Sequence, residues 1–199
     1  IANFLFSFAS AILLCAATLV PAHADIKIGF QVPLTGPAAT DGKSAQLAGQ
    51  MAVEDINAAG GVLGQKLELV TYDDQAKSDQ AIFTANKLIG EDGVKLVVNA
   101  SYSASGRAAA PVFQKAGVVM IAAYGVHPDI TKAGDYMFRL VHLGPPQGVA
   151  TALYIGKTPG LKRVSTITMA PDSGQATMDG FLSAADPYGT GVLHKYRYS

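Results

Sequence analysis

The chain has 199 residues, of which 49% are hydrophobic, and its 15 basic and 15 acidic side chains give a formal net charge of zero. This is an ordinary globular composition, long enough for one domain or one and a half. The neutral balance and the lack of a basic run argue against a nucleic-acid-binding surface. The single cysteine, Cys15, lies in a segment that we expect to be removed, so the folded protein must rely on its core rather than on disulfides.

Residues 1–24 contain no Lys, Arg, Asp or Glu. An apolar stretch at residues 4–20 is followed by Ala22-His23-Ala24, a small-x-small sequence typical of signal-peptide cleavage. We predict a cleavable signal peptide at 1–24 and hence an exported protein. A membrane anchor is the less favoured alternative, because the apolar run is short for a membrane span. There is no initiator Met and no basic segment at the start, so we expect the start to be truncated.

Short apolar runs rich in Val and Ile alternate with segments of helical periodicity in the first part of the chain. We predict strands at residues 26–32, 66–72, 94–98 and 118–121. We predict helices at residues 41–59, 78–89 and about 105–116. This alternation indicates right-handed βαβ crossovers, and hence an α/β fold with a parallel, doubly wound (Rossmann-like) sheet covered on both faces.

The first predicted helix should begin at Asp41, a residue suited to cap a helix, and end at Gly60-Gly61, where glycine accepts a left-handed conformation. Its core-facing side chains are predicted to be Ala48, Met51, Ala52 and Ile56. The helix that precedes the fourth strand contains Pro111, which either kinks that helix or marks its first turn.

After Ile130 the rhythm changes: residues 136–141 are predicted to form a strand, and residues 136–146 are interpreted as a segment that crosses to a second unit. The segments that follow are predicted as helix 147–157, strand 163–168, helix 175–184 and strand 192–198. The predicted organisation is therefore a signal peptide at 1–24, a first α/β lobe at 25–140 and the start of a second α/β lobe at 141–199. We expect the second lobe to be truncated, and the first to lack a returning segment.

A polar loop at residues 99–105 joins a predicted strand to a helix and carries Ser101, Tyr102, Ser103 and Ser105. Hydroxyls, free backbone N–H groups and the positive end of a helix dipole meet there, which suits a small anion such as a carboxylate. Ligands of open α/β sheets lie outside the carboxyl ends of the strands, so this loop and the loop at 122–127 are predicted to form two walls of a ligand site. The alternative is that the serines only cap the helix. Tyr102 and Tyr124 would either stack on a ligand or be ordinary half-buried packing.

No motif for catalysis or cofactor binding is found. The glycine-rich run at residues 60–64 follows a helix and precedes a strand, the reverse of the order that dinucleotide binding needs. There is no P-loop and no Gly-x-Ser-x-Gly nucleophile elbow. Asp73 and Asp74 are interpreted as a strand-end turn and helix cap rather than as a metal pair or acid/base carboxylates. The histidines are not paired at metal-ligand spacing. We therefore expect no cofactor, no metal and no enzymatic activity.

Three segments, together with the serine loop, resemble the periplasmic leucine/isoleucine/valine-binding proteins: DIKIGFQVPLTGPAA, AVEDINAAGGVLGQKLELVTYDD and AAPVFQKAGVVMI. The resemblance runs from Asp25 to about Ala185. It implies the type I periplasmic binding fold, with two α/β lobes joined by three crossings. It also implies a ligand clamped in the cleft between the lobes, and delivery of that ligand to the membrane permease subunits of an ABC importer.

The resemblance implies that Ser103 takes the place of the family's carboxylate-binding serine. The other residues implied at the site by the two loops are Ser101, Tyr102, Tyr124, Gly125 and Val126. Three positions depart from leucine-type binders, and we expect them to border the ligand. Val126 stands where Thr is usual, Asp41 where an aromatic residue is usual, and Ser173 where Tyr is usual.

We therefore predict the N-terminal part of a monomeric, exported solute-binding protein for an amino acid or a related small carboxylate or amide, with no nucleic-acid partner. The family is longer than this chain, so we expect the chain to expose apolar surface. A ligand sensor on the same fold, such as an amide- or urea-type sensor, is an alternative, and a Rossmann-like enzyme is a weaker one. The ligand itself stays open among amino acids, amides, urea and small aromatic acids.

Overall fold

The computed structural model describes residues 25–169 and 173–198, with the side chain of Ser173 outside the described part. The predicted signal peptide also lies outside the described residues. Strands and helices alternate as predicted through the first unit. Its strands are β1 (Ile26–Val32), β2 (Leu67–Asp73), β3 (Leu96–Asn99), β4 (Val119–Ala122) and β5 (Met137–Arg139). Its helices are α2 (Ala39–Ala58), α3 (Ser78–Gly90), α4 (Ser103–Ala116) and α5 (Asp129–Lys132).

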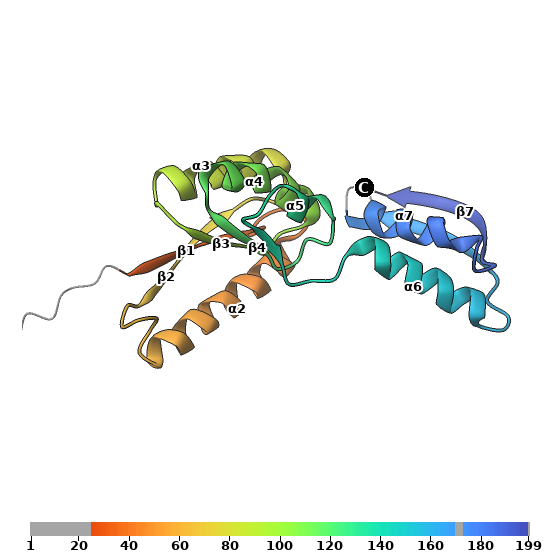
Figure 1. Cartoon of the computed structure of the whole chain (residues 1–199), viewed down its shortest axis with the longest axis horizontal. Coiled ribbons are helices and arrows are strands. Elements are labelled where there is room, and N and C mark those ends of the chain that lie inside the picture. The colour runs from red at the N-terminus through yellow and green to blue at the C-terminus, as the bar shows by residue number, and fades with distance from the viewer. Residues whose placement is uncertain (1–24, 170–172, 199) are drawn as a thin grey trace, which may run out of the picture.

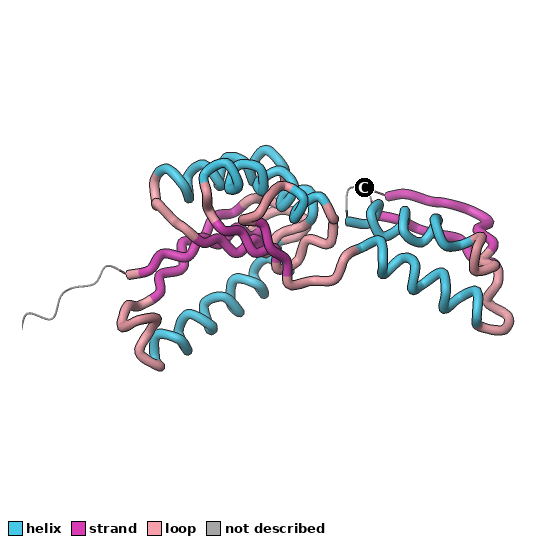
Figure 2. Tube along the Cα trace, in the orientation of Figure 1, coloured by secondary structure: helices cyan, strands magenta, loops and turns pink. Residues whose placement is uncertain are grey.

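The five strands form one parallel sheet in the order β2-β1-β3-β4-β5. Phe30 of β1 pairs with Thr71 of β2 on one side and with Val98 of β3 on the other. Helix α2 covers one face of this sheet, and α3, α4 and α5 lie on the other (Figures 1 and 2). This is the predicted doubly wound α/β fold. The strand order reverses between β1 and β3, so a ligand is expected at the carboxyl ends of those two strands.

The hydrophobic core lies between the sheet and helices α3 and α4. Its largest side chains, all 0% exposed, are Leu88, Val97, Phe113, Met120 and Ile130. Burying each such side chain is worth about 1.5–3 kcal/mol. Gly29 of β1 makes room for this packing, since a Cβ at that position would lie 2.8 Å from Cγ2 of Val97 and 3.1 Å from Leu88.

The predicted start of the first helix is wrong. Helix α2 begins at Ala39, and Ala38 occupies the N-cap position without a side-chain cap. Asp41 therefore lies within the first turn and does not cap the helix. The predicted end is confirmed, because Gly60 and Gly61 follow the helix with φ angles of 104° and 76°. Those angles fall in the region that favours glycine.

The predicted core face of α2 is exposed. Met51 is 55% exposed and Ile56 is 39% exposed, and the two alanines of that face are exposed as well. The helix approaches the sheet through glycine instead: a Cβ at Gly49 would lie 3.3 Å from both Phe30 and Leu69. Close approach of the helix backbone thus replaces interdigitation of large side chains. Met51 and Ile56 are thus apolar side chains that this helix leaves exposed.

Helix α4 begins at Ser103, so part of the predicted serine loop belongs to the helix. Pro111 lies inside this helix, which continues to Ala116, and therefore does not mark its first turn. The helix ends at Gly117, whose φ of 65° is the left-handed conformation common after a helix.

The second unit contains α6 (Gly144–Lys157), β6 (Arg163–Met169), α7 (Ser173–Ala185) and β7 (Gly191–Tyr198). Strands β6 and β7 pair in parallel. Helices α6 and α7 supply the side chains of a small buried core: Ala152, Phe181, Ala184 and Ala185. The predicted strand at 136–141 forms as the shorter β5, which pairs with β4 as the edge of the first sheet, so the first part of the predicted crossing segment 136–146 belongs to the first unit. The chain reaches the second unit only after β5 (Figure 1). None of the helices in the described ranges has the length and apolar character needed to cross a membrane.

The contact between α6 and α7 leads to a test of the second unit. A Cβ at Gly148 would collide with the carbonyl oxygen of Thr177 and the nitrogen of Phe181. We expect Gly148→Ala to lower the free energy of unfolding by about 1–3 kcal/mol, since overpacking outweighs the gain in helix propensity. Urea unfolding followed by far-UV circular dichroism measures the loss.

The matched control is Gly90→Ala at the end of α3, where no atom lies within 4 Å of the added Cβ. This control should be neutral or slightly stabilising. Equal unfolding midpoints for the two variants would contradict the close packing of α6 on α7.

Candidate functional site

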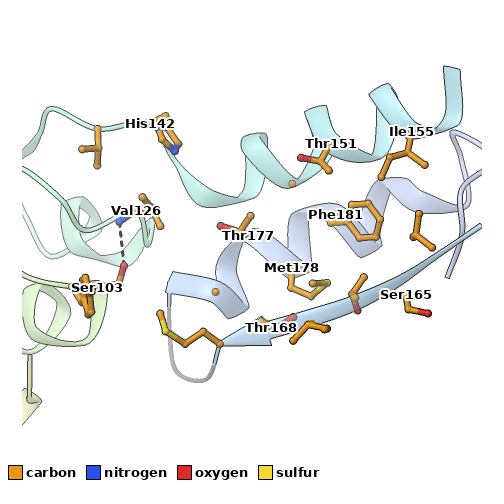
Figure 3. A pocket seen from close by; sticks show the side chains of 18 of the residues that line it. Ser103, Val126, His142, Thr151, Ile155, Ser165, Thr168, Thr177, Met178 and Phe181 are labelled. Atoms are coloured by element: carbon orange, nitrogen blue, oxygen red, sulfur yellow. Dashed lines mark hydrogen bonds between the residues drawn. The ribbon is translucent and has the colours of Figure 1, made fainter. Parts of the chain in front are cut away.

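A cavity of about 740 Å³ lies between the two units. The first unit contributes Tyr102 and Ser103, around the start of α4, and Tyr124 and Val126 from the loop after β4. Figure 3 shows the opposite wall, built from α6, β6 and α7. That wall includes His142, Thr151, Ile155, Thr168, Thr177 and Phe181. The volume is in the range of small-molecule sites, roughly 300–1,000 Å³.

Ser103 joins the two predicted loops. Its Oγ accepts hydrogen bonds from the backbone N–H of Val126 at 3.1 Å and of His127 at 3.2 Å. Figure 3 draws the first of these. Ser103 borders the cavity although it is 0% exposed. Because two N–H groups already occupy the oxygen, its hydroxyl can act toward a ligand only through its hydrogen.

Tyr102 and Tyr124 stack on each other, with ring centroids 5.4 Å apart and planes at 26°. The hydroxyl of Tyr102 donates to Oδ2 of Asp41 at 2.6 Å. This hydrogen bond, assisted by burial, raises the pKa of Tyr102 to about 12, so the phenol stays neutral near pH 7. The rings pack against one another and border the cavity, so packing is shown, whereas stacking on a ligand stays a prediction.

Ser101 and Ser105 donate into the protein rather than into the cavity. Ser101 Oγ donates to Oδ1 of Asp74 at 3.0 Å, and Ser105 donates a short hydrogen bond to Oδ2. All three residues are 0% exposed. The prediction that the hydroxyls of the serine loop face an anion is therefore corrected for Ser101 and Ser105, since these two serve a buried carboxylate that also accepts the N–H of Ala76 at 3.0 Å. Burial raises the pKa of Asp74, and these hydrogen bonds partly oppose the rise.

Asp73, at the end of β2, orders the turn beside Asp74. Its Oδ1 accepts the N–H of Leu34 at 2.8 Å and of Gln75 at 2.9 Å. Partial burial raises the pKa of Asp73, but hydrogen bonds, led by that from the Thr35 hydroxyl, outweigh it and leave the pKa lowered. The predicted strand-end turn is confirmed, whereas the predicted helix cap is wrong, because α3 has no side-chain cap. No cluster of three His, Cys, Asp or Glu in the described ranges could hold a metal ion.

Helix ends rather than charged side chains set the electrostatics of the cavity. Among its described lining residues there is no Asp, Glu, Lys or Arg. The N-terminal end of α4 has no side-chain cap, and Gly174 from the first turn of α7 lies in the cavity wall. A helix N-terminus carries about half a positive charge and several unpaired N–H groups. The uncapped end of α4 beside a cavity without acidic or basic side chains favours a small anion.

Residues 25–199 match the model of a family described as periplasmic binding protein. The chain belongs to the periplasmic binding protein family. The resemblance to leucine/isoleucine/valine-binding proteins is confirmed by relatives. The Leu/Ile/Val-binding protein BraC3 of Rhizobium johnstonii is 34% identical over 182 residues, covering 90% of this chain and 49% of the relative. An amino acid binding protein of Pseudomonas aeruginosa is 36% identical over 159 residues, covering 79% of this chain and 42% of the relative.

Solved structures of periplasmic binding proteins agree with this fold. A solute binding protein of an ABC transporter from Rhodopseudomonas palustris, in complex with 3,4-dihydroxy benzoic acid, superimposes with a TM-score of 0.80 at 25% identity, over 87% of this chain and 47% of that one. LivJ from Streptococcus pneumoniae, in complex with isoleucine, gives 0.78 at 28% identity, over 88% and 50%. The chain therefore spans about half the length of the proteins it matches.

In this periplasmic binding protein, five of the predicted site residues come together at one end of the sheet: Tyr102, Ser103, Tyr124, Gly125 and Val126. Gly125 permits this approach, because a Cβ there would lie 2.6 Å from Ile130 Cδ1 and 3.5 Å from Ser103 Cα. Asp41 lies in a neighbouring hollow rather than in the cavity wall. Ser173 is the first residue of α7, and its side chain is outside the described part.

Sequence reasoning missed the cavity residues of the second unit of this periplasmic binding protein. His142, Thr168 and Thr177 line the cavity from three different segments, and no local motif links them. One signal was available: β6 has the sequence RVSTITM, and the three hydroxyl side chains of this strand all line the cavity. A strand with hydroxyls at 165, 166 and 168 is more polar than the core strands of the first unit.

The buried carboxylate of Asp74 should make stability depend on pH. Its pKa is higher in the folded protein than the ordinary 3.8, so protonation favours folding. Stability from this group is present below pH 3.8 and decreases as pH rises from there through the folded-state pKa. Relative to Asp74→Asn, which does not titrate, the wild type should therefore lose unfolding free energy as the pH rises above about 4.

Urea unfolding of both proteins over a series of pH values above this point measures the difference, with Asp55→Asn on the exposed side of α2 as the control substitution. If the unfolding free energy of the wild type instead rises relative to Asp74→Asn as the pH increases, burial does not dominate the pKa of Asp74.

Proposed function

We propose that this protein is the exported, non-enzymatic solute-binding component of an ABC importer. It binds a small carboxylate, such as an amino acid, in the cavity between two lobes at residues 25–140 and 141–199. It then delivers that ligand to a membrane permease, and residues 1–24 direct its export. The observation that carries the proposal is the uncapped N-terminal end of α4, which borders the cavity at Ser103.

The proposed ligand contacts follow from the donors at this end of α4. The ligand carboxylate accepts hydrogen bonds from first-turn backbone N–H groups and from the hydrogen of the Ser103 hydroxyl. Hydrogen bonds to a charged group contribute about 1.5–3 kcal/mol each, and more where water is excluded. The substitution of Val126 for the usual Thr leaves this mode intact, because Val126 contacts Ser103 through its backbone.

Closure of the two lobes is the proposed signal to the permease. The loop after β4 already touches the second unit, since the N–H of Gly144 at the start of α6 donates to the carbonyl of Val126 at 3.0 Å. A ligand that contacts α4 on one side and α6, β6 or α7 on the other favours the closed state by its differential affinity. The relatives bound to isoleucine and to 3,4-dihydroxy benzoic acid support a small carboxylate as the ligand class.

The proposal is tested with the full-length protein by thermal shift and calorimetric titration. The panel contains leucine, isoleucine, 3,4-dihydroxybenzoate, a small amide and urea. We expect at least one carboxylate to raise the melting temperature. We expect Ser103→Ala to weaken the binding of that carboxylate by about tenfold or more. The expected loss equals at least one hydrogen bond to a charged group.

Ser183→Ala is the matched control, because Ser183 is exposed on α7 and its Oγ donates within its own helix to the carbonyl of Gly180 at 2.8 Å. It should bind the ligand with wild-type affinity. A wild-type protein that responds to no carboxylate in the panel, beside a responsive leucine-binding protein, would count against the proposed function.

A further inference from the structure

A second hollow of about 330 Å³ adjoins the main cavity and shares Tyr102 and Tyr124 with it. Its other lining residues are Pro33, Asp41, Ser44, Ala45, Ala100 and Ala123. These residues follow the carboxyl ends of β1, β3 and β4. The hollow therefore lies at the point where the strand order reverses, the usual ligand position in an open parallel sheet.

Asp41 is the charged side chain of this hollow. Its Oδ2 accepts the hydroxyl of Tyr102, whereas Oδ1 has no hydrogen-bond partner among the described residues. The Ser44 hydroxyl donates to the carbonyl of Thr40 at 3.0 Å, one turn earlier in α2. The hollow thus presents one open carboxylate oxygen beside two stacked aromatic rings.

The main cavity has the opposite character. The uncapped N-terminal end of α4 borders it, and its described lining contains no acidic side chain. A ligand that spans both spaces meets hydrogen-bond donors at α4 and an acceptor at Asp41. The tyrosine pair lies between the two, because both rings border both spaces.

We propose that Asp41 and the Tyr102–Tyr124 pair form a subsite for a hydrogen-bond-donating group of the ligand. The ligand is therefore a small carboxylate that also carries an ammonium, amide or phenolic hydroxyl, and a carboxylate with only a hydrocarbon remainder is rejected. This inference rests on the proposed function. A hydrogen-bond donor of the ligand pairs with the free oxygen of Asp41. A hydrocarbon group in the same place would displace water from that carboxylate and offer no hydrogen bond in return.

Matched ligand pairs test the subsite in the full-length protein. Leucine is compared with 4-methylpentanoate, which lacks its ammonium, and 3,4-dihydroxybenzoate with benzoate. In at least one pair, we expect the donor-bearing member to bind about tenfold more tightly or better. In Asp41→Asn that preference should fall below about threefold. The Asn oxygen can still accept from Tyr102, but its amide then presents a donor in place of the free oxygen.

Asp55→Asn is the control, since it makes the same change at an exposed position of α2 outside both spaces. It should keep the wild-type preference in each pair. Equal binding of both members of each pair, or a preference unchanged in Asp41→Asn, overturns the subsite while the carboxylate-binding function stands. A wild type that binds none of the four compounds overturns the proposed function and the subsite together.

Discussion

The arrangement of the site depends on the oxygen of Ser103, which accepts two backbone N–H groups from the loop after β4. This contact attaches one strand-end loop to the first turn of the helix that follows another strand. Helix geometry explains why Ser103 and Ser105 have different hydrogen-bond partners. Two residues of an α-helix are about 200° apart around its axis, so their side chains leave opposite sides. Ser103 meets the loop, and Ser105 meets the buried carboxylate of Asp74.

The two sets of hydrogen bonds have complementary effects. Asp74 is a buried acceptor that fixes the start of α4 through hydrogen bonds from the hydroxyls of Ser101 and Ser105. Because these hydroxyls donate to Asp74, none of their hydrogens is left for a ligand. In the proposed binding mode, the anion is therefore held by the N–H groups of the helix end and by the Ser103 hydroxyl, not by Ser101 and Ser105. The field of the cavity is consequently that of oriented peptide groups, which are preorganised by the fold.

Much of the first unit could be predicted from the sequence, because buried parallel strands appear as short Val- and Ile-rich runs bounded by Gly and polar residues. The meeting of Ser103 with the 124–126 loop was also predictable, since neighbouring parallel strands end at the same edge of the sheet. The face of α2 that packs on the sheet could not be predicted in this way. Periodicity favoured the larger side chains, such as Met51, whereas the helix packs through Gly49. Glycine adds nothing to an apolar pattern, yet it allows the closest approach.

The second wall of the cavity shows a different limit of sequence reasoning. Residues such as His142 and Thr177 join the site only when the chain leaves β5 and turns into α6. That geometry depends on contacts between units, which no local pattern records. The inward orientation of Ser101 was missed for a similar reason, because its partner Asp74 belongs to a different strand end.

The loop at residues 124–128 makes hydrogen bonds on two opposite sides, and the two polar groups of a single peptide unit can serve both. The carbonyl of Gly125 and the N–H of Val126 belong to one trans peptide group, so they point in opposite directions. Arg139 donates to that carbonyl at 3.0 Å, while the N–H donates to Ser103. Arg139 also donates to the carbonyl of His127 at 2.9 Å. Burial lowers the pKa of Arg139, but a guanidinium remains charged at any ordinary pH.

A cation behind the carbonyls of this loop polarises its peptide groups and strengthens the N–H donors on the opposite side. The carbonyl of Val126 is the exception, since it accepts the N–H of Gly144 at the start of α6. Val126 therefore binds the first unit through its nitrogen and the second through its oxygen. In the proposed closure, a rotation of the second unit against the first would act on this hydrogen bond of Val126. The proposed ligand contact at Ser103 would be linked to it through adjacent backbone atoms of the same residue.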